Sequence, residues 1–163
     1  MSYILGSDDE ITLALMETNH DDRLYFEIRL NENSNVVGHI SYHFRDVKIF
    51  GNVEVFISEE YRGNNYAKKA LSILIENLYK IDNNDIYLSI HQDNIASIKS
   101  AISCGAKLDH VTKIPKRFSF SENGKYKYTN VCIIENNNTN KEKVKSKKYF
   151  KRNNKRRDKN DRY

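Results

Sequence analysis

The chain has 163 residues, of which 39% are hydrophobic and 30% charged, and its formal net charge is +5 at pH 7. This length and composition predict one globular domain with its own hydrophobic core and argue against two domains. No apolar run is long enough to cross a membrane, and the first residues lack the basic start and apolar stretch of a secretory signal. We therefore expect a cytoplasmic protein without a membrane partner.

The first part of the chain alternates apolar and polar residues, as antiparallel strands do. Residues 11–16 predict a short strand, residues 24–30 (LYFEIRL) alternate cleanly, and residues 36–44 follow a cluster of turn formers, NENSN. Residues 53–57 form the fourth predicted strand. Together these runs predict a β-meander.

The fourth strand continues through a turn that carries Arg62 and Gly63 into an amphipathic helix, predicted over residues 66–79. The first N–H groups of a helix have no intrahelical partner and lie at the positive end of its dipole. A strand that enters a helix in this way therefore predicts a site for an anion such as a phosphate.

Residues 86–90 (IYLSI) predict a short strand, so that residues 53–90 form a βαβ crossover with parallel strands. Asp93 or Asn94 is expected to cap a second helix that ends near Gly105. The isoleucines at 95, 98 and 102 and the alanine at 101 are expected to face inward.

Beyond Pro115, two alternating runs joined through Asn123–Gly124 predict a β-hairpin. The fold class is therefore mixed α/β. Cys104 and Cys132 lack the spacing of metal ligands and stand alone in apolar segments, which indicates buried thiols in a reducing compartment and predicts no metal site.

The charge is divided unevenly along the chain. Residues 136–163 hold 12 Lys or Arg and 3 Asp or Glu, whereas residues 1–135 hold 15 and 19. The final segment has few apolar residues, so we predict a domain at 1–135 followed by a disordered basic tail at 136–163. Its basic clusters could bind RNA, ribosomes or another polyanion, or the tail could be merely solvated.

Two motifs resemble those of the GNAT acyltransferases, which move an acetyl group from acetyl-CoA to an amine. The segment YRGNNYAKKAL resembles the family's phosphate loop from Arg62 to Ala67, and HQDNIASIKSAISCGAKL supplies the Asn that opens the later helix, Asn94, with Ser97 after it. The DNxxS spacing looks most like the branch of ribosomal-protein N-terminal and spermidine acetyltransferases. The resemblance covers roughly residues 24–134. It implies a GNAT fold, with a mostly antiparallel mixed sheet, a parallel βαβ core and a C-terminal hairpin.

The resemblance implies that the loop holds the pyrophosphate of acetyl-CoA. Backbone N–H groups of five residues would donate to it: Gly63, Asn64, Asn65, Tyr66 and Ala67. Arg62 could lie beside the phosphates or pair with Glu59 or Glu60. Lys68 and Lys69 could add positive charge beside the phosphates, or they could form a solvated helix face. Asn65 stands where the family most often has glycine; Asn tolerates a positive φ, whereas a side chain against the pyrophosphate would weaken binding.

The fold implied by the resemblance separates the fourth and fifth strands of the family. Backbone groups near Phe56 and Ile57 would then be free to pair with the pantetheine arm of the cofactor. Asn94 resembles the family's pantetheine-contacting Asn, and it could equally be a plain helix cap.

Acetyl transfer requires a neutral amine and a proton for the departing thiolate. Glu54 is the first candidate base, although it could be a charge on an exposed strand face, and His43 and His91 are the alternatives. Many relatives protonate the thiolate with a Tyr seven residues after the Asn, but Ala101 stands there. Ser97 could serve the thiolate, or it could be an ordinary first-turn serine.

Residues 16–24 (METNHDDRL) leave no room for the two helices that relatives carry near this point. The acceptor site would then be open, which suits a protein N-terminus or completion by the second subunit of a homodimer. The acceptor amine itself stays open. The alternative function is a non-catalytic module of this fold that binds nucleic acid or a partner through its basic tail.

Overall fold

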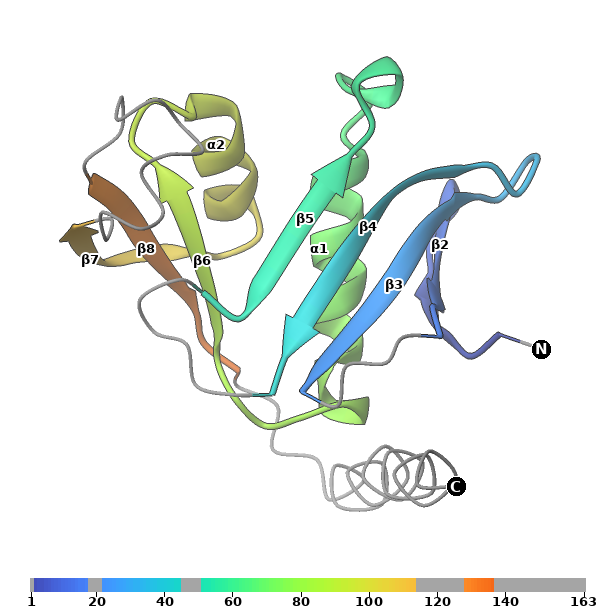
Figure 1. Cartoon of the computed structure of the whole chain (residues 1–163), viewed down its shortest axis with the longest axis horizontal. Helices are drawn as coiled ribbons and strands as arrows, with labels where there is room; N and C mark the ends of the chain where they lie inside the picture. The colour runs from blue at the N-terminus through green and yellow to red at the C-terminus, as the bar shows by residue number, and fades with distance from the viewer. Residues whose placement is uncertain (1, 18–21, 45–50, 114–127, 137–163) are drawn as a thin grey trace, which may run out of the picture.

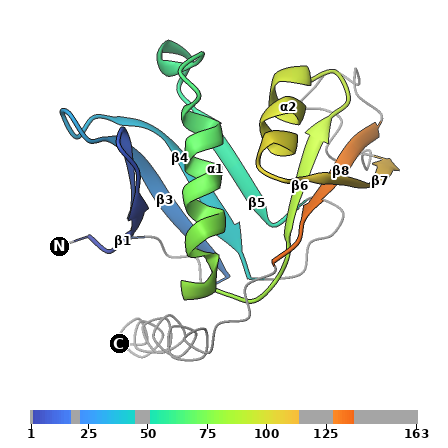
Figure 2. The same cartoon turned by 180° about the vertical axis from the view of Figure 1, so that it is seen from behind.

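The computed structural model describes residues 2–17, 22–44, 51–113 and 128–136. In these residues the strands form two sheets, which diverge as the arms of a V (Figure 1). Helix α1 lies behind the larger sheet, and α2 lies against the smaller one (Figures 1 and 2). The elements are β1 (Ile4–Ser7), β2 (Ile11–Leu15), β3 (Arg23–Leu30), β4 (Val36–His43), β5 (Val53–Ile57), α1 (Tyr66–Asn77), β6 (Ile86–His91), α2 (Ile95–Ser103), β7 (Lys107–Lys113) and β8 (Tyr128–Ile134).

The larger sheet is an antiparallel meander in the order β1-β2-β3-β4-β5. The alternation of β3 explains its packing, because Leu24, Phe26 and Ile28 are buried while the residues between them are half-buried. The four predicted strands are confirmed. The sequence did not predict β1, which has four residues and buries only Leu5.

Helix α1 covers one face of this sheet. It buries Ala70, Leu71, Ile73 and Leu74, whereas its opposite side is largely polar. The helix ends at Asn77, two residues before the predicted end, and passes into a 3₁₀ turn at Leu78–Lys80. None of the helices in the described residues is long and apolar enough to cross a bilayer.

The crossover from β5 through α1 to β6 joins two strands that run in the same direction (Figure 1). They do not pair as parallel neighbours, because β5 is the edge of one sheet and β6 the edge of the other. A single antiparallel bridge between Gly51 and Leu88 joins the sheets where the strands begin to diverge. The expected separation is confirmed, but the predicted parallel pairing is absent from the described residues.

The smaller sheet has the order β6-β8-β7. Strand β8 matches the second arm of the predicted hairpin, whereas the first arm and the Asn123–Gly124 turn lie outside the described residues. The sequence did not predict β7, most of whose side chains are exposed. The inward assignment of Ile95 and Ile102 was wrong: they are 55% and 59% exposed, because α2 packs chiefly through Ala101.

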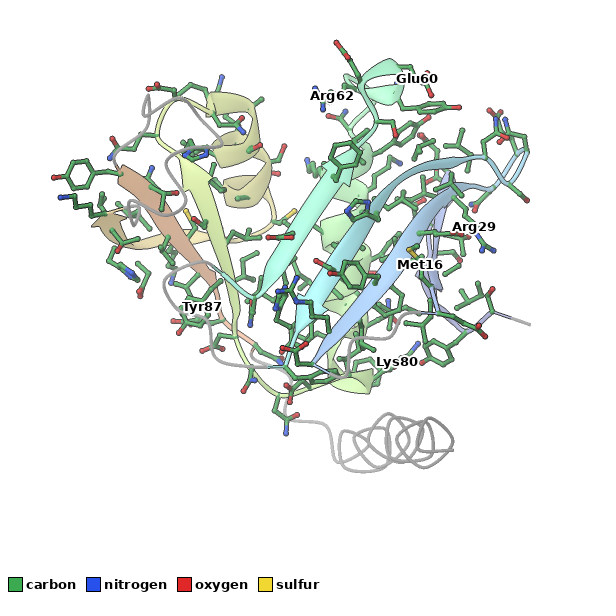
Figure 3. The ribbon with its side chains drawn as sticks, in the orientation of Figure 1. Met16, Arg29, Glu60, Arg62, Lys80 and Tyr87 are labelled. Carbon is green, nitrogen blue, oxygen red and sulfur yellow. The ribbon has the colours of Figure 1, made fainter. Side chains whose placement is uncertain are left out.

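Asn52 joins the two sheets at the base of the V through hydrogen bonds. Its polar side chain is buried there, with the residue only 2% exposed. Its backbone N–H donates to the Tyr87 carbonyl at 3.0 Å, and its carbonyl accepts from the His43 N–H at 2.7 Å. Its side chain accepts from the Tyr87 N–H and donates to the Asp85 carbonyl, both at 2.8 Å. The amide therefore fixes where β6 departs from the larger sheet; Tyr87 is labelled in Figure 3.

Replacing Asn52 with alanine is expected to lower the free energy of unfolding by about 2–4 kcal/mol, because it removes two buried hydrogen bonds to backbone groups. Urea denaturation measures the change. Asn64→Ala is the matched control, because it also removes a side-chain bond to a carbonyl, but at an exposed position. Equal losses in the two variants would show that Asn52 does not fasten the sheets.

Candidate active site

The loop between β5 and α1 has a backbone that favours residues without a bulky β-branch. Asn65 has φ 62° and ψ 18°, and Gly63 has φ 84°. The sequence left two possibilities open for Asn65, and the structure shows the first of them, a positive φ. Asparagine is the non-glycine residue that tolerates this region best. A Cβ built on Gly63 would meet nothing within 4 Å, so the surface there is open.

Helices α1 and α2 begin differently. The first helical bond of α1 runs from the Lys69 N–H to the Asn65 carbonyl at 3.0 Å, and the Asn65 side chain makes no capping bond. The N–H groups of Tyr66 and Ala67 therefore have neither an intrahelical partner nor a side-chain cap. By contrast, Asn94 caps α2 by accepting from the Ser97 N–H at 3.2 Å. Of the two helices, α1 is therefore the one whose first N–H groups are left without a side-chain cap.

Arg62 binds the end of β5 instead of a neighbouring carboxylate. Its Nε donates to the Ile57 carbonyl at 3.0 Å. No ion pair with Glu59 or Glu60 occurs among the described residues. This bond holds the exposed guanidinium at the loop, near the open end of the V (Figure 3). Asn64 supports the same turn, since its Nδ2 donates to the Tyr61 carbonyl at 3.0 Å.

Lys69 forms ion pairs with the turn between β1 and β2. Its Nζ lies 3.2 Å from a Glu10 oxygen, 3.4 Å from Asp9 and 3.7 Å from Asp8. The hydrogen bond to Glu10, helped by the other two carboxylates, raises the pKa of Lys69. Lys69 therefore belongs to a surface ion cluster, and Lys68 is the exposed lysine next to the loop.

The edge of β5 faces the V. The Ser58 N–H donates to the Val37 carbonyl at 2.9 Å, and in an antiparallel ladder such bonds recur at every second residue. The backbone groups of Phe56 thus point toward β4, while those of Val55 and Ile57 point toward the V. Free backbone groups were expected near both Phe56 and Ile57. The expectation is wrong for Phe56, whose groups face β4. At Ile57 it applies to the N–H alone, because the carbonyl accepts from Arg62.

Glu54 projects from the face of the sheet that α1 does not cover, which we call the open face. Its side chain is exposed, and its strand neighbours Val53 and Val55 point the other way. No helix among the described residues lies over this face (Figure 1). By alternation and register, the open face is formed by Arg23, Tyr25, Glu27, Arg29, His39, Ser41, His43, Glu54 and Phe56.

His43 lies beside Glu54 on the open face. Its pKa is lowered first by burial and then by the Arg23 guanidinium, against the opposing charges of Glu54 and Asp22. The imidazole is therefore mainly neutral at pH 7. Arg23 is held nearby by donating from Nη1 to the Tyr25 hydroxyl at 3.2 Å. Glu54 and His43, both candidate bases, thus share one cluster.

Ser41 lies between Tyr25 and Glu54 in the register of the open face. It is 1% exposed, and its hydroxyl makes no hydrogen bond to the described part of the chain. An unpaired buried hydroxyl costs about 1–3 kcal/mol. The sheet therefore holds a polar atom beside the candidate base at a cost in stability.

Replacing Ser41 with alanine is expected to raise the free energy of unfolding by about 1 kcal/mol, because it removes that unpaired hydroxyl. Thermal or urea denaturation measures the effect. The matched control is Thr129→Val, which removes a buried hydroxyl that is paired with Ser89 at 3.0 Å and should lower stability. If both variants lose stability equally, Ser41 has a partner.

The remaining candidates lie on the other arm of the V. Asn94 and Ser97 begin α2, His91 ends β6, and Ala101 is buried within α2. The structure thus brings the loop and Ile57 together at the open end, with Glu54 farther back along β5. Glu54 and Ser97 lie on opposite arms.

Sequence reasoning missed Asn52, Ser41 and Arg23. Ser41 and Arg23 occupy alternate positions of confirmed strands, so the alternation could have placed them on the face of Glu54. Asn52 gave no comparable signal, because its partners come from a distant strand. Among the described residues no group of three or more His, Cys, Asp or Glu could hold a metal ion.

Comparisons with known proteins identify the family and the fold. Residues 6–107 match the family model described as "Acetyltransferase (GNAT) domain". A comparison with curated proteins found no match.

Several solved structures share the fold. A candidate ribosomal-protein-serine acetyltransferase from Vibrio cholerae is 15% identical with a TM-score of 0.60, covering 82% of this chain and 97% of that one. The ribosomal-protein-S5-alanine acetyltransferase from Vibrio fischeri is 20% identical with a TM-score of 0.59, covering 74% and 66%. A Vibrio cholerae spermidine N-acetyltransferase in complex with CoA and spermine is 16% identical with a TM-score of 0.55, covering 69% and 65%.

Proposed function

We propose that this chain, which belongs to the GNAT acetyltransferase family, transfers the acetyl group of acetyl-CoA to a primary amine. The observation that carries the proposal is the uncapped start of α1, reached through Asn65 with its positive φ. Several N–H donors converge there without a side chain of the chain itself to satisfy them. A pyrophosphate supplies the acceptor oxygens that such a site lacks.

The residues of the V fit acetyl-CoA in three respects. The amides of residues 63–67 would bind its pyrophosphate, and Arg62 would add a positive charge beside it. The V-facing backbone groups of Val55 and the N–H of Ile57 would pair with the pantetheine arm, as an added strand does. Asn94 would contact the same arm from the opposite side while it caps α2.

Acetyl-CoA supplies an activated acetyl thioester. The neutral amine forms a bond to the carbonyl carbon, the carbon–sulfur bond breaks, and the amine proton leaves. We assign Glu54 the removal of that proton, because it lies on the open face of the strand that borders the V. Ser97 would stabilise the departing thiolate by donating a hydrogen bond.

The acceptor would approach from the open face, because α1 covers the other face of the larger sheet. No helix covers this face among the described residues, which favours a large or externally held acceptor such as a protein N-terminus. A second copy of the chain could also complete the pocket; one structural neighbour is described as dodecameric. The expected compartment is the cytoplasm.

The second candidate function is a non-catalytic module that binds RNA or another polyanion. The observation that favours it is the charge of residues 136–163, with 12 Lys or Arg against 3 Asp or Glu. Both activities could also coexist, with the tail bringing the enzyme to an anionic surface.

Calorimetric titration with acetyl-CoA, on the intact chain and on a chain ending at Glu135, tests the proposal. We expect saturable binding in both chains, since the site lies within residues 53–97. No binding in either chain would contradict the enzyme. Salt-sensitive RNA binding that disappears on truncation would then favour the module.

A further inference from the structure

We propose that the acceptor carries a single primary amine next to a flat, ring-containing group, and that Tyr25, His39 and Phe56 bind this ring. These three residues, which we call the aromatic row, lie on the open face. The inference rests on the proposed function, because it describes the acceptor of that reaction.

The aromatic row crosses three neighbouring strands. The His39 and Phe56 rings are stacked, with centroids 5.3 Å apart and planes at 26°, and the Tyr25 and His39 rings follow at 6.4 Å and 59°. Phe56 is 47% exposed, although aromatic side chains of this size are usually buried. The row therefore presents ring surface that the described part of the chain does not cover.

The row lies next to the candidate base. Phe56 and Glu54 are alternate residues of β5 and point to the same face, while His39 lies opposite Phe56 in the ladder. An amine whose nitrogen reaches Glu54 would thus place its neighbouring group over Phe56 and His39. Stacking on such rings contributes about 0.5–1.5 kcal/mol beyond the buried area.

The charges of the open face argue against a polycation. Its described carboxylates are Glu27 and Glu54, and its guanidinium groups are Arg23 and Arg29. Glu27 is already occupied, since its Oε2 accepts from Arg29 Nε at 2.7 Å. Of the two carboxylates, Glu54 is the one without an ion pair among the described residues, and the positive charge of Arg23 acts on both Glu54 and the nearby Asp22. This face suits one amine and disfavours a second positive charge.

Acetyl transfer by the intact chain should therefore be compared on four acceptors: phenylethylamine, a peptide with N-terminal Phe, the same peptide with N-terminal Gly, and spermidine. We expect kcat/KM for the better ring-bearing acceptor to exceed those for the Gly peptide and spermidine by about tenfold, the equivalent of about 1.4 kcal/mol. The first two acceptors distinguish a free amine from a peptide terminus.

Variants of His39 test whether the row causes the preference. His39→Ala should reduce the ratio of kcat/KM for the Phe peptide to kcat/KM for the Gly peptide to about one-third of its wild-type value or less. His39→Phe should preserve the wild-type ratio. Tyr128→Ala is the control, because Tyr128 is 50% exposed on β8 of the other sheet and should not alter the ratio. Turnover with a preference for spermidine, or without a ring preference, would overturn this inference alone. No acetyl-CoA binding would overturn the proposed function, and the inference with it.

Discussion

Replacing Glu54 with glutamine is expected to lower kcat/KM for acetyl transfer at neutral pH by about a hundredfold or more, because a positioned general base contributes about 10²–10⁴ to such a step. Glutamine keeps the shape of the side chain but cannot take the amine proton. The affinity for acetyl-CoA should stay the same, since Glu54 projects from the open face and not from the V-facing edge of β5. Steady-state kinetics and calorimetry measure the two effects separately.

His43→Gln is the matched control for this prediction. His43 lies in the same cluster and, because burial and Arg23 lower its pKa, it is mainly neutral at pH 7 and could also accept a proton. If Glu54 is the base, His43→Gln should lower kcat/KM much less than Glu54→Gln. If His43 is the base, its variant would cause the larger loss.

The second large effect concerns the loop. Asn65→Val is expected to weaken acetyl-CoA binding by about tenfold or more, because a β-branched residue at positive φ costs at least about 1–2 kcal/mol. That strain shifts the loop away from the conformation that aligns the amides, and affinity falls with the population that remains. Calorimetric titration with acetyl-CoA measures the loss.

Asn65→Gly is the control, because glycine adopts φ near 62° without steric cost. It should bind acetyl-CoA at least as tightly as the wild type. If both variants bind equally well, the backbone of residue 65 does not determine the site. A large gain in the glycine variant would instead show that the Asn65 side chain obstructs the pyrophosphate.

Local patterns predicted the elements whose burial follows their own periodicity. The alternation of residues 24–30 and the spacing of Ala70, Leu71 and Leu74 on α1 were sufficient, because one face of each element packs against a core. The αL backbone of Asn65 was one of two possibilities that the sequence left open, because asparagine tolerates a positive φ. The same reasoning failed for Ile102, whose apolar side chain has no element packed over it among the described residues.

Features that depend on distant partners could not be predicted. Strand β1 is recognisable only by its pairing with β2, and β7 only by its pairing with β8. The divergence of β5 from β6 depends on Asn52 and its bonds to residues 85 and 87, more than thirty positions away. The sequence favoured a solvated side chain for Lys69, because its partner Glu10 comes from a distant turn that only the fold places beside it.

The most direct test of the site is an NMR titration of the 15N-labelled chain with acetyl-CoA, observing the amides of residues 63–67. We predict saturable shifts of these N–H signals, with a common dissociation constant, and smaller shifts at the amides of β1, which the proposed site does not include. Shifts confined to other regions, with the amides at the start of α1 unchanged, would contradict the account.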